Sequence, residues 1–270
     1  MKSGTTSLFH ELSEFATIVT TIDKEPNVLT DAQSKSQAIV LYQRQFGRSR
    51  PSRIRLEAST EYTKMEAAQA ASRALSWLEP NIRLIYMIRS PVERAISHYH
   101  HDFVRGSHKQ SIREALLSPE PANPYIAVSR YLDRLRPWAE RFPEDQIYIV
   151  RLEDYIVDHG RTMEGILSWL GLDDVVRTAP ILENASSARP TLKGMWKTVA
   201  RSGLYRSTLR RVLPPSLRSQ IRYSLLPRGP VQLPQLGDDD HSKLTDLLWI
   251  ECAAHLRAKS ATLKDSSFLS

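Results

Sequence analysis

A short apolar run that leads directly into a capped helix is the feature that most constrains the fold. Residues 83–88, Arg-Leu-Ile-Tyr-Met-Ile, have the continuous hydrophobicity of a strand that is covered on both faces of a parallel sheet. Ser90 follows as a helix N-cap, Pro91 suits the first helical position, and Glu93 completes a Ser-x-x-Glu capping box. Arg89 therefore stands at the carboxyl end of a strand, where open α/β sheets bind their ligands.

The start of the chain carries a second candidate anion site. Residues 2–8 are Lys-Ser-Gly-Thr-Thr-Ser-Leu, and an amphipathic helix is predicted over residues 8–15. A helix N-terminus presents unpaired backbone N–H groups and the positive end of the helix dipole, so it favours an anion. The expected phosphate ligands are Lys2, Ser3, Gly4, Thr5, Thr6 and Ser7. The lysine precedes the glycine, which is not the Walker A order and counts against an ordinary ATPase or kinase.

The remaining hydrophobic pattern alternates strands with helices, which is typical of an α/β protein. Extended segments are predicted over residues 16–22, 54–56 and 146–150. Helices are predicted over residues 65–78, 125–142, 162–170 and 244–256, with Gly171 as the C-cap of the third.

Composition narrows the class of protein. The 270 residues include 41% hydrophobic and 25% charged residues, as in ordinary globular proteins, and no run of about 18 apolar residues predicts a membrane span. No signal peptide is expected at the N-terminus. Cys252 is the only cysteine, which excludes an intramolecular disulfide and favours the cytoplasm. No cluster of cysteine and histidine has metal-ligand spacing, so no metal is expected.

Positive charge is concentrated late in the chain. The net charge is +7, and no acidic residue stands between Glu183 and Asp238, although lysines and arginines are frequent there. Such a local excess points to an anionic partner. Apolar residues stand among the arginines of segment 196–228, so this segment could form an amphipathic helix in peripheral contact with a membrane or an anionic glycan. A surface helix whose arginines pair with acids is the alternative. Nucleic acid is a weaker expectation, because no recognised motif accompanies the charge.

The two anion-site motifs together resemble those of the sulfotransferases that use 3′-phosphoadenosine 5′-phosphosulfate (PAPS), of the heparan-sulfate and bacterial type. Lys-Ser-Gly-Thr-Thr-Ser-Leu resembles their 5′-phosphosulfate loop, and Arg89-Ser-Pro-x-x-Arg-x-x-Ser97-x-Tyr resembles their 3′-phosphate motif. Residues 152–155 and 169–172 resemble later family segments. Segment 57–62 matches less well, because alanine and threonine stand where relatives have a lysine and a proline, which leaves the acceptor site less defined.

The resemblance implies a fold and a reaction. The fold would be a P-loop-like three-layer sandwich, with a mostly parallel central sheet flanked by helices, in a single domain over residues 1–270 that ends in a basic, proline-containing region over 196–237. A strand would precede the phosphate loop, and we expect it to be missing from this chain. The reaction would move a sulfuryl group from PAPS to the hydroxyl of a glycan, glycolipid or other alcohol, releasing adenosine 3′,5′-bisphosphate.

The resemblance also assigns site residues. Lys2 would be catalytic and would contact the 5′ end of PAPS together with Ser3 to Ser7. Glu25, which Pro26 keeps out of a helix, matches the place of the catalytic base. Arg89 and Ser97 would hold the 3′-phosphate. A later nucleotide loop would contribute Arg189, Lys193 and Gly194.

Two alternatives stay open at this point. A truncated or non-catalytic relative would bind an anionic nucleotide or glycan without turnover. A P-loop kinase or NTPase would need a Walker lysine and a Mg²⁺-binding carboxylate at a strand end, and neither is evident in the sequence.

Overall fold

In the computed structural model, the described residues are 3–46, 54–78, 81–106, 110–118, 123–172 and 232–269. The predictions made for Lys2, Arg189, Lys193, Gly194 and segment 196–228 lie outside these residues and stay predictions. No helix within the described ranges is long and apolar enough to cross a membrane.

The described strands run mostly parallel, as predicted. β1 (Ile18–Thr20) pairs in parallel with β2 (Ile54–Leu56). β3 (Leu84–Ile88) pairs in parallel with β4 (Ile147–Arg151), and the short β5 (Ala261–Thr262) joins the other edge of β4 in the antiparallel direction. The ladders therefore form one two-stranded and one three-stranded piece.

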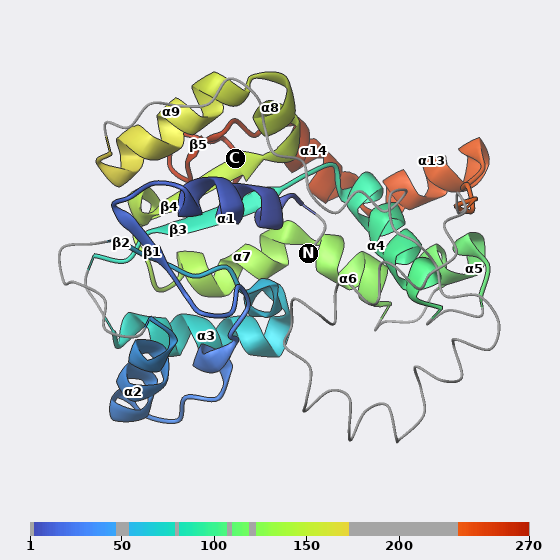
Figure 1. Ribbon diagram of the computed structural model, residues 1–270. Coiled ribbons are helices and arrows are strands. Elements are labelled where there is room, and N and C mark those ends of the chain that lie inside the picture. Colours follow the sequence, from blue (N-terminus) through green and yellow to red (C-terminus); the bar gives the residue numbers. More distant parts are fainter. Residues whose placement is uncertain are drawn as a thin grey trace, which may run out of the picture.

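Helices cover both faces of these strands (Figure 1). On one side lie α1 (Thr5–Ser13), α8 (Leu152–Val157) and α9 (His159–Leu170). On the other side lie α3 (Met65–Ser76) and α7 (Tyr131–Ala139). This arrangement confirms the predicted three-layer α/β class, and the left-handed Gly171 ends α9 as expected.

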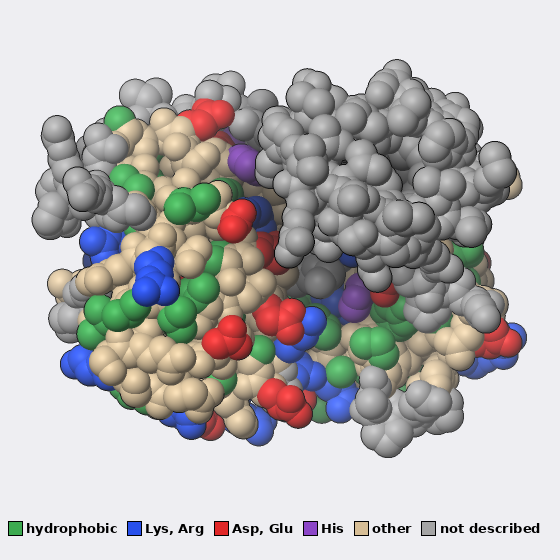
Figure 2. Space-filling model, turned by 60° about the horizontal axis from the view of Figure 1, so that its bottom comes forward, with side chains coloured by type: hydrophobic (Ala, Val, Ile, Leu, Met, Phe, Trp, Pro, Cys, Tyr) green, Lys and Arg blue, Asp and Glu red, His purple; other side chains and the backbone are tan. Residues whose placement is uncertain are grey.

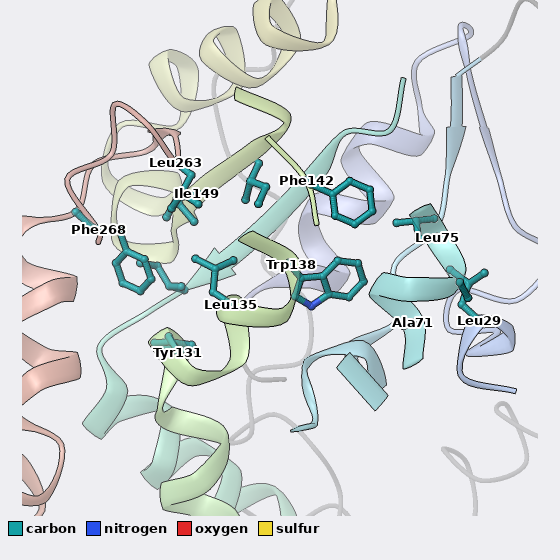
Figure 3. Packing of buried hydrophobic residues seen from close by; sticks show 14 of the residues in the cluster. Leu29, Ala71, Leu75, Tyr131, Leu135, Trp138, Phe142, Ile149, Leu263 and Phe268 are labelled. Carbon is teal, nitrogen blue, oxygen red and sulfur yellow. The ribbon is translucent and has the colours of Figure 1, made fainter. Parts of the chain in front are cut away.

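The side chains of β4 point alternately to the two faces of the sheet, so this strand packs against both helix layers. Tyr148 and Val150 pack with α1, α8 and α9, whereas Ile147 and Ile149 pack with α3 and α7, because successive side chains of a strand point to opposite faces. Figure 3 shows Trp138 of α7 among the buried side chains of the second layer. Each large apolar side chain that is fully buried contributes roughly 1.5–3 kcal/mol.

A third apolar cluster lies beyond the strands. It joins α4 (Pro91–Arg105), α5 (Ile112–Leu116), α6 (Pro124–Ser129) and α13 (Asp238–Leu247). The last of these helices comes from the far end of the sequence, so the carboxyl-terminal part of the chain closes around α4 (Figure 1).

The prediction of a single helix over residues 125–142 is wrong. The structure has two helices there, because α6 ends at Ser129 and α7 begins at Tyr131. Tertiary contacts replace the helical hydrogen bonds at the break. The N–H of Leu132 donates to the carboxylate of Glu251 at 3.1 Å, and the guanidinium of Arg134 donates twice to the carbonyl of Ala127. The break therefore depends on partners that local periodicity cannot reveal.

The helix predicted over residues 244–256 is likewise divided into α13 and α14 (Trp249–Arg257). Leu244 and Leu248 pack in the cluster around α4, whereas Ala254 packs in the layer of α3 and α7. α13 and α14 bury their apolar residues in different clusters, so one straight helix could not pack against both clusters.

The remaining helix is α2 (Lys35–Gln45), with Ser34 as its N-cap. Short 3₁₀ turns occupy η1 (Val28–Thr30), η2 (Thr60–Thr63) and η3 (Glu144–Gln146).

The burial of β3 differs from the prediction. Leu84, Ile85 and Tyr86 are only half-buried, and the fully buried part of the strand begins at Met87. These three residues line a cavity of about 680 Å³ that extends to β2. The sequence pattern described a central strand correctly, but one edge of β3 faces this cavity instead of another described strand.

Candidate functional site

The phosphate loop predicted from the sequence forms a tight left-handed turn. Gly4 has φ +84° and is the N-cap of α1. A Cβ at this position would lie 2.6 Å from Leu152 Cδ1 and 3.3 Å from Met87 Cε. Both neighbours stand at the carboxyl ends of β3 and β4, so glycine lets the loop approach these ends closely.

The N-terminus of α1 can supply the backbone donors of an anion site. No side chain among the described residues forms a capping hydrogen bond there, and the first helical bond runs from Leu8 N–H to Gly4 at 3.2 Å. The N–H groups of the first turn are therefore oriented as an anion site requires. Thr5 and Thr6 are half-buried, whereas Ser3 and Ser7 are buried, so the threonines are the more accessible hydroxyl donors.

Tyr131, at the start of α7, brings the two anion-site motifs together. Its hydroxyl lies 3.4 Å from Ser3 Oγ and accepts from the Arg89 N–H at 3.4 Å. Burial raises the pKa of Tyr131, so the phenol keeps its proton and can donate to Ser3 while it accepts from Arg89. No sequence motif marks this tyrosine, and only the fold reveals its position.

The capping box predicted for α4 is half correct. Glu93 N–H donates to Ser90 Oγ at 3.5 Å and Pro91 occupies the first turn, as expected. The Ser90 N–H, however, donates to Glu153 at 2.9 Å. Because that donor is already used, the Glu93 carboxylate turns to Arg89, 3.8 Å from its Nη2.

Glu153 links the Arg89 turn to the carboxyl-terminal helix α14. One carboxylate oxygen accepts from Ser90, and the other lies 3.1 Å from His255 Nε2. Burial alone would raise the pKa of Glu153, but the hydrogen bonds from His255 and Ser90 outweigh it and lower the pKa to about 2. No sequence motif indicates that a histidine so far along the chain would be the partner of Glu153.

Glu25 lies in the turn that follows β1, tethered by its neighbours. Lys24 Nζ lies 2.9 Å from Glu25 Oε1, and Thr60 Oγ1 donates to Oε2 at 2.8 Å. Partial burial would raise the pKa of Glu25, but the hydrogen bond and charge of Lys24 and the hydrogen bond of Thr60 lower it overall. The carboxylate is 39% exposed and ionised at neutral pH, so it can accept a proton from a ligand.

A second carboxylate, Glu57, follows β2 beside this turn. Its Oε1 accepts from Tyr62 at 2.6 Å and from Ser59 at 2.7 Å. Burial raises the pKa of Glu57, although both hydrogen bonds act in the opposite direction. The loop after β2 also pairs with the turn of Glu25, because Ala58 N–H donates to the Lys24 carbonyl at 3.3 Å. The two loops therefore position each other.

Arg94 and Ser97 of the second motif take different places on α4. Arg94 is fully buried, with Nε donating to Ser129 Oγ at 2.7 Å and Nη2 donating to the Tyr125 carbonyl. Burial lowers its pKa to about 10, and the side chain fastens α4 to α6. Ser97 is half-buried two turns into α4.

Charges of both signs are interspersed in this region. Figure 2 shows acidic and basic side chains interspersed on one face of the molecule. The site residues that the structure describes follow the ends of strands: Glu25 after β1, Glu57 after β2, Arg89 after β3 and Glu153 after β4. Within the described ranges, no group of three or more potential metal ligands is placed to hold an ion.

Comparison with known proteins gives consistent results. The family model described as "Sulfotransferase domain" matches residues 1–195. Heparan sulfate glucosamine 3-O-sulfotransferase 6 of Mus musculus is 25% identical over 198 residues, which are 72% of this chain and 56% of that protein. Heparan sulfate glucosamine 3-O-sulfotransferase 3B1 of Mus musculus is 24% identical over 199 residues, or 72% and 50% of the two proteins. The chain thus spans about half the length of these relatives.

A solved structure resembles the whole chain. The sulfotransferase from Alicyclobacillus acidocaldarius superposes with a TM-score of 0.56 at 20% identity, over 95% of each chain. This likeness supports the α/β fold.

Proposed function

The chain belongs to the sulfotransferase-domain family, and from this premise we propose that it moves a sulfuryl group from PAPS to an acceptor hydroxyl and releases adenosine 3′,5′-bisphosphate. The observation that carries the proposal is the meeting of the two anion-site motifs at Tyr131. One motif supplies the N-terminus of α1, which has no side-chain cap among the described residues, and the other supplies Arg89 at the end of β3. Two anion sites side by side fit a ligand that carries phosphates at both its 5′ and 3′ positions.

The donor would lie with its 5′ end on the turn of Gly4 and the N–H groups of α1. Thr5 and Thr6 would donate to the phosphate oxygens, and Lys2 would neutralise the oxygen that bridges phosphorus and sulfur. Arg89 and Ser97 would hold the 3′-phosphate, where a guanidinium can make paired hydrogen bonds. Further contacts are proposed from a later loop that contains Arg189, Lys193 and Gly194.

The proposed chemistry is an in-line displacement at sulfur. The acceptor oxygen attacks sulfur, the bond from sulfur to the 5′-phosphate oxygen breaks, and its electron pair stays on that phosphate. Negative charge spreads over the sulfonyl and leaving oxygens, so the main contribution is electrostatic, from Lys2 and the α1 N–H groups.

Glu25 would take the proton of the acceptor hydroxyl. Its lowered pKa keeps the carboxylate ionised and available, and Lys24 and Thr60 fix both of its oxygens. A base placed in this way typically accelerates a reaction about 10²–10⁴-fold. Glu57 is less suited to this role, because its side chain is more buried than that of Glu25.

For the acceptor we propose a carbohydrate hydroxyl. The named relatives act on the glucosamine of heparan sulfate, and the charged groups around Glu25 can donate to and accept from a polyol.

The test is a transfer assay with PAPS and a panel of acceptors that includes heparan fragments, simple glycosides, a glycolipid and short alcohols. We expect adenosine 3′,5′-bisphosphate to be released with at least one sugar acceptor and a sulfated product of matching mass. Nucleotide binding without transfer to any acceptor would support the alternative of a non-catalytic relative. Phosphoryl transfer from ATP in the same assay would support the kinase alternative.

A further inference from the structure

Helix α14, near the carboxyl end of the described residues, carries two buried polar side chains on one face. Glu251 and His255 stand four positions apart, so one helical turn brings them to the same side of the helix. Both side chains are buried. A buried carboxylate and a buried imidazole each cost free energy unless they have hydrogen-bond partners. No motif in the sequence marks either residue, so their partners indicate what they do.

Glu251 holds the first turn of α7. Its Oε2 accepts from the Leu132 N–H at 3.1 Å. Burial raises the pKa of Glu251, and this hydrogen bond acts in the opposite direction. Among the described residues, the N-cap Arg130 forms no capping hydrogen bond with its own side chain, so a carboxylate from α14 takes up a donor of this helix end. The placement of Tyr131, the first residue of α7, thus depends on α14.

His255 holds the first turn of α4 through Glu153. Its Nε2 lies 3.1 Å from Glu153 Oε2, while Glu153 Oε1 accepts from the Ser90 N–H at 2.9 Å. Cys252, which lies between the two buried polar residues of α14, packs against the apolar cluster around α4. α14 therefore contacts α4 and is linked to the N-terminal turn of α4 through a carboxylate.

The Arg89 turn is where these two sets of contacts meet. The Arg89 N–H donates to the Tyr131 hydroxyl at 3.4 Å, and the next N–H, that of Ser90, donates to Glu153. Two successive peptide groups are therefore anchored on acceptors that α14 holds, one through each of its buried polar side chains. Because peptide groups are planar, anchoring both of them fixes the direction in which the Arg89 side chain leaves the backbone.

We propose that Glu251 and His255 are positioning residues of the 3′-phosphate site, and that through them α14 keeps Arg89 where it distinguishes a nucleotide with a 3′-phosphate from one without. The inference rests on the proposed function, because it takes Arg89 as a ligand of that phosphate. Both residues act through the turn and are not themselves nucleotide ligands. Small misplacements of a binding group cost affinity steeply, so the loss of either contact should be measurable.

The experiment compares adenosine 3′,5′-bisphosphate with AMP by calorimetry in variants of α14. His255→Leu fills the space without a donor, whereas His255→Gln can still donate to Glu153. Leu256→Ala is the matched control on the same helix, because Leu256 is 76% exposed. We expect His255→Leu to weaken binding of the bisphosphate roughly tenfold, as for one charged hydrogen bond, and to change that of AMP less than about twofold. His255→Gln and Leu256→Ala should stay close to the wild-type protein.

Glu251 is tested by a second pair of variants. Glu251→Leu removes the acceptor for the Leu132 N–H, whereas Glu251→Gln keeps one in its amide oxygen. We expect the same selective loss of bisphosphate affinity in Glu251→Leu and its recovery in Glu251→Gln. Weakening of both nucleotides to the same extent in the leucine variants would overturn the proposal, because the two residues would then support the overall structure only.

A double variant separates positioning from a general effect on stability. In an Arg89→Ala protein, His255→Leu should weaken the bisphosphate no further, because the contact that it positions is already absent. Circular dichroism shows whether each variant is folded. Losses that add in full in the double variant would contradict the proposal.

Hydrogen exchange in the wild-type protein gives an answer that needs no variant. Effects between two linked sites are reciprocal, so a saturating concentration of the bisphosphate should slow exchange over residues 249–257 more than saturating AMP does, with α2 as the reference. Equal protection by the two nucleotides would overturn the proposal. A wild-type protein that binds no bisphosphate would contradict the proposed function and this inference with it, whereas normal binding in all the leucine variants would contradict the positioning role alone.

Discussion

The half of the molecule built on β3 and β4 differs from the half built on β1 and β2 in how it holds its site residues. Residues 147–150 of β4 are buried, and the Arg89 turn is fixed by hydrogen bonds from its backbone N–H groups to Tyr131 and Glu153. In the other half the strands are three residues long, and Glu25 is held by side chains while its carboxylate remains 39% exposed.

This difference suggests a division of work. Groups that bind a fixed ligand gain from rigid placement, because misplacement costs affinity and rate steeply. A base that must reach the hydroxyl of an incoming acceptor needs exposure instead. Under the proposed function, changes in the β3–β4 half should alter donor affinity, and changes in the β1–β2 half should alter turnover.

The largest expected effect is that of replacing Glu25, which should lower turnover without changing donor affinity. Replacement by glutamine keeps the size of the side chain but removes its basicity, so kcat should fall about 10²–10⁴-fold. The affinity for adenosine 3′,5′-bisphosphate, measured by calorimetry, should stay unchanged. Glu61→Gln is the matched control, since Glu61 is a nearby carboxylate paired with Lys64. Full activity in Glu25→Gln would remove this residue from the mechanism.

On the other half, Arg89→Ala should weaken binding of adenosine 3′,5′-bisphosphate roughly 10- to 100-fold, because a charged hydrogen-bonded contact is lost. Binding of AMP, which has no 3′-phosphate, should change little. Arg113→Ala serves as the control, because this arginine is 67% exposed on α5. An equal loss of affinity for both nucleotides would mean that Arg89 acts on overall structure.

Gly4→Ala tests the turn that joins the phosphate loop to the β3–β4 half. Alanine in the left-handed region costs roughly 1–2 kcal/mol, and here its Cβ would also meet Leu152 at 2.6 Å. The free energy of unfolding should therefore fall by at least that amount in a denaturant titration. Gly160→Ala in α9 has open space around the new Cβ and should be neutral or slightly stabilising. The same stability for both variants would argue against the close approach.

The smallest expected effect is on the pH dependence of stability and comes from Glu153. Its pKa in the folded protein is about 2, below the ordinary value of 4.5. Ionised Glu153 therefore stabilises the fold above pH 4.5, and this contribution is lost as the pH falls toward 2. The gap in melting temperature between the wild-type protein and Glu153→Gln should shrink over that range. A gap that stays constant with pH would show that the charge of Glu153 is not what links Ser90 to His255.

The sequence predicted those parts of the fold that depend on local pattern. β4, the end of α9 at Gly171 and the Ser90–Pro91 start of α4 follow from residue types within a few positions. The break before Tyr131 does not, because a carboxylate from α14 caps the second helix.

The same distinction applies to the candidate site. Residue spacing predicted a loop at Gly4 that leads into a helix and placed Arg89 just after a strand. In the structure Gly4 is the N-cap of α1, and β3 ends at Ile88. Tyr131 and His255 belong to no motif, and they join the site through contacts between segments far apart in the chain. Such partners are set by packing, so a single sequence gives no sign of them.

The central claim is that the two joined motifs form a site for a nucleotide with phosphates at both ends of its ribose. Its most direct test is a calorimetric titration of the folded protein with adenosine 3′,5′-bisphosphate and, separately, with AMP. We predict that the bisphosphate binds at least tenfold more tightly than AMP. Equal affinities, or no binding by a protein that circular dichroism shows to be folded, would contradict the account.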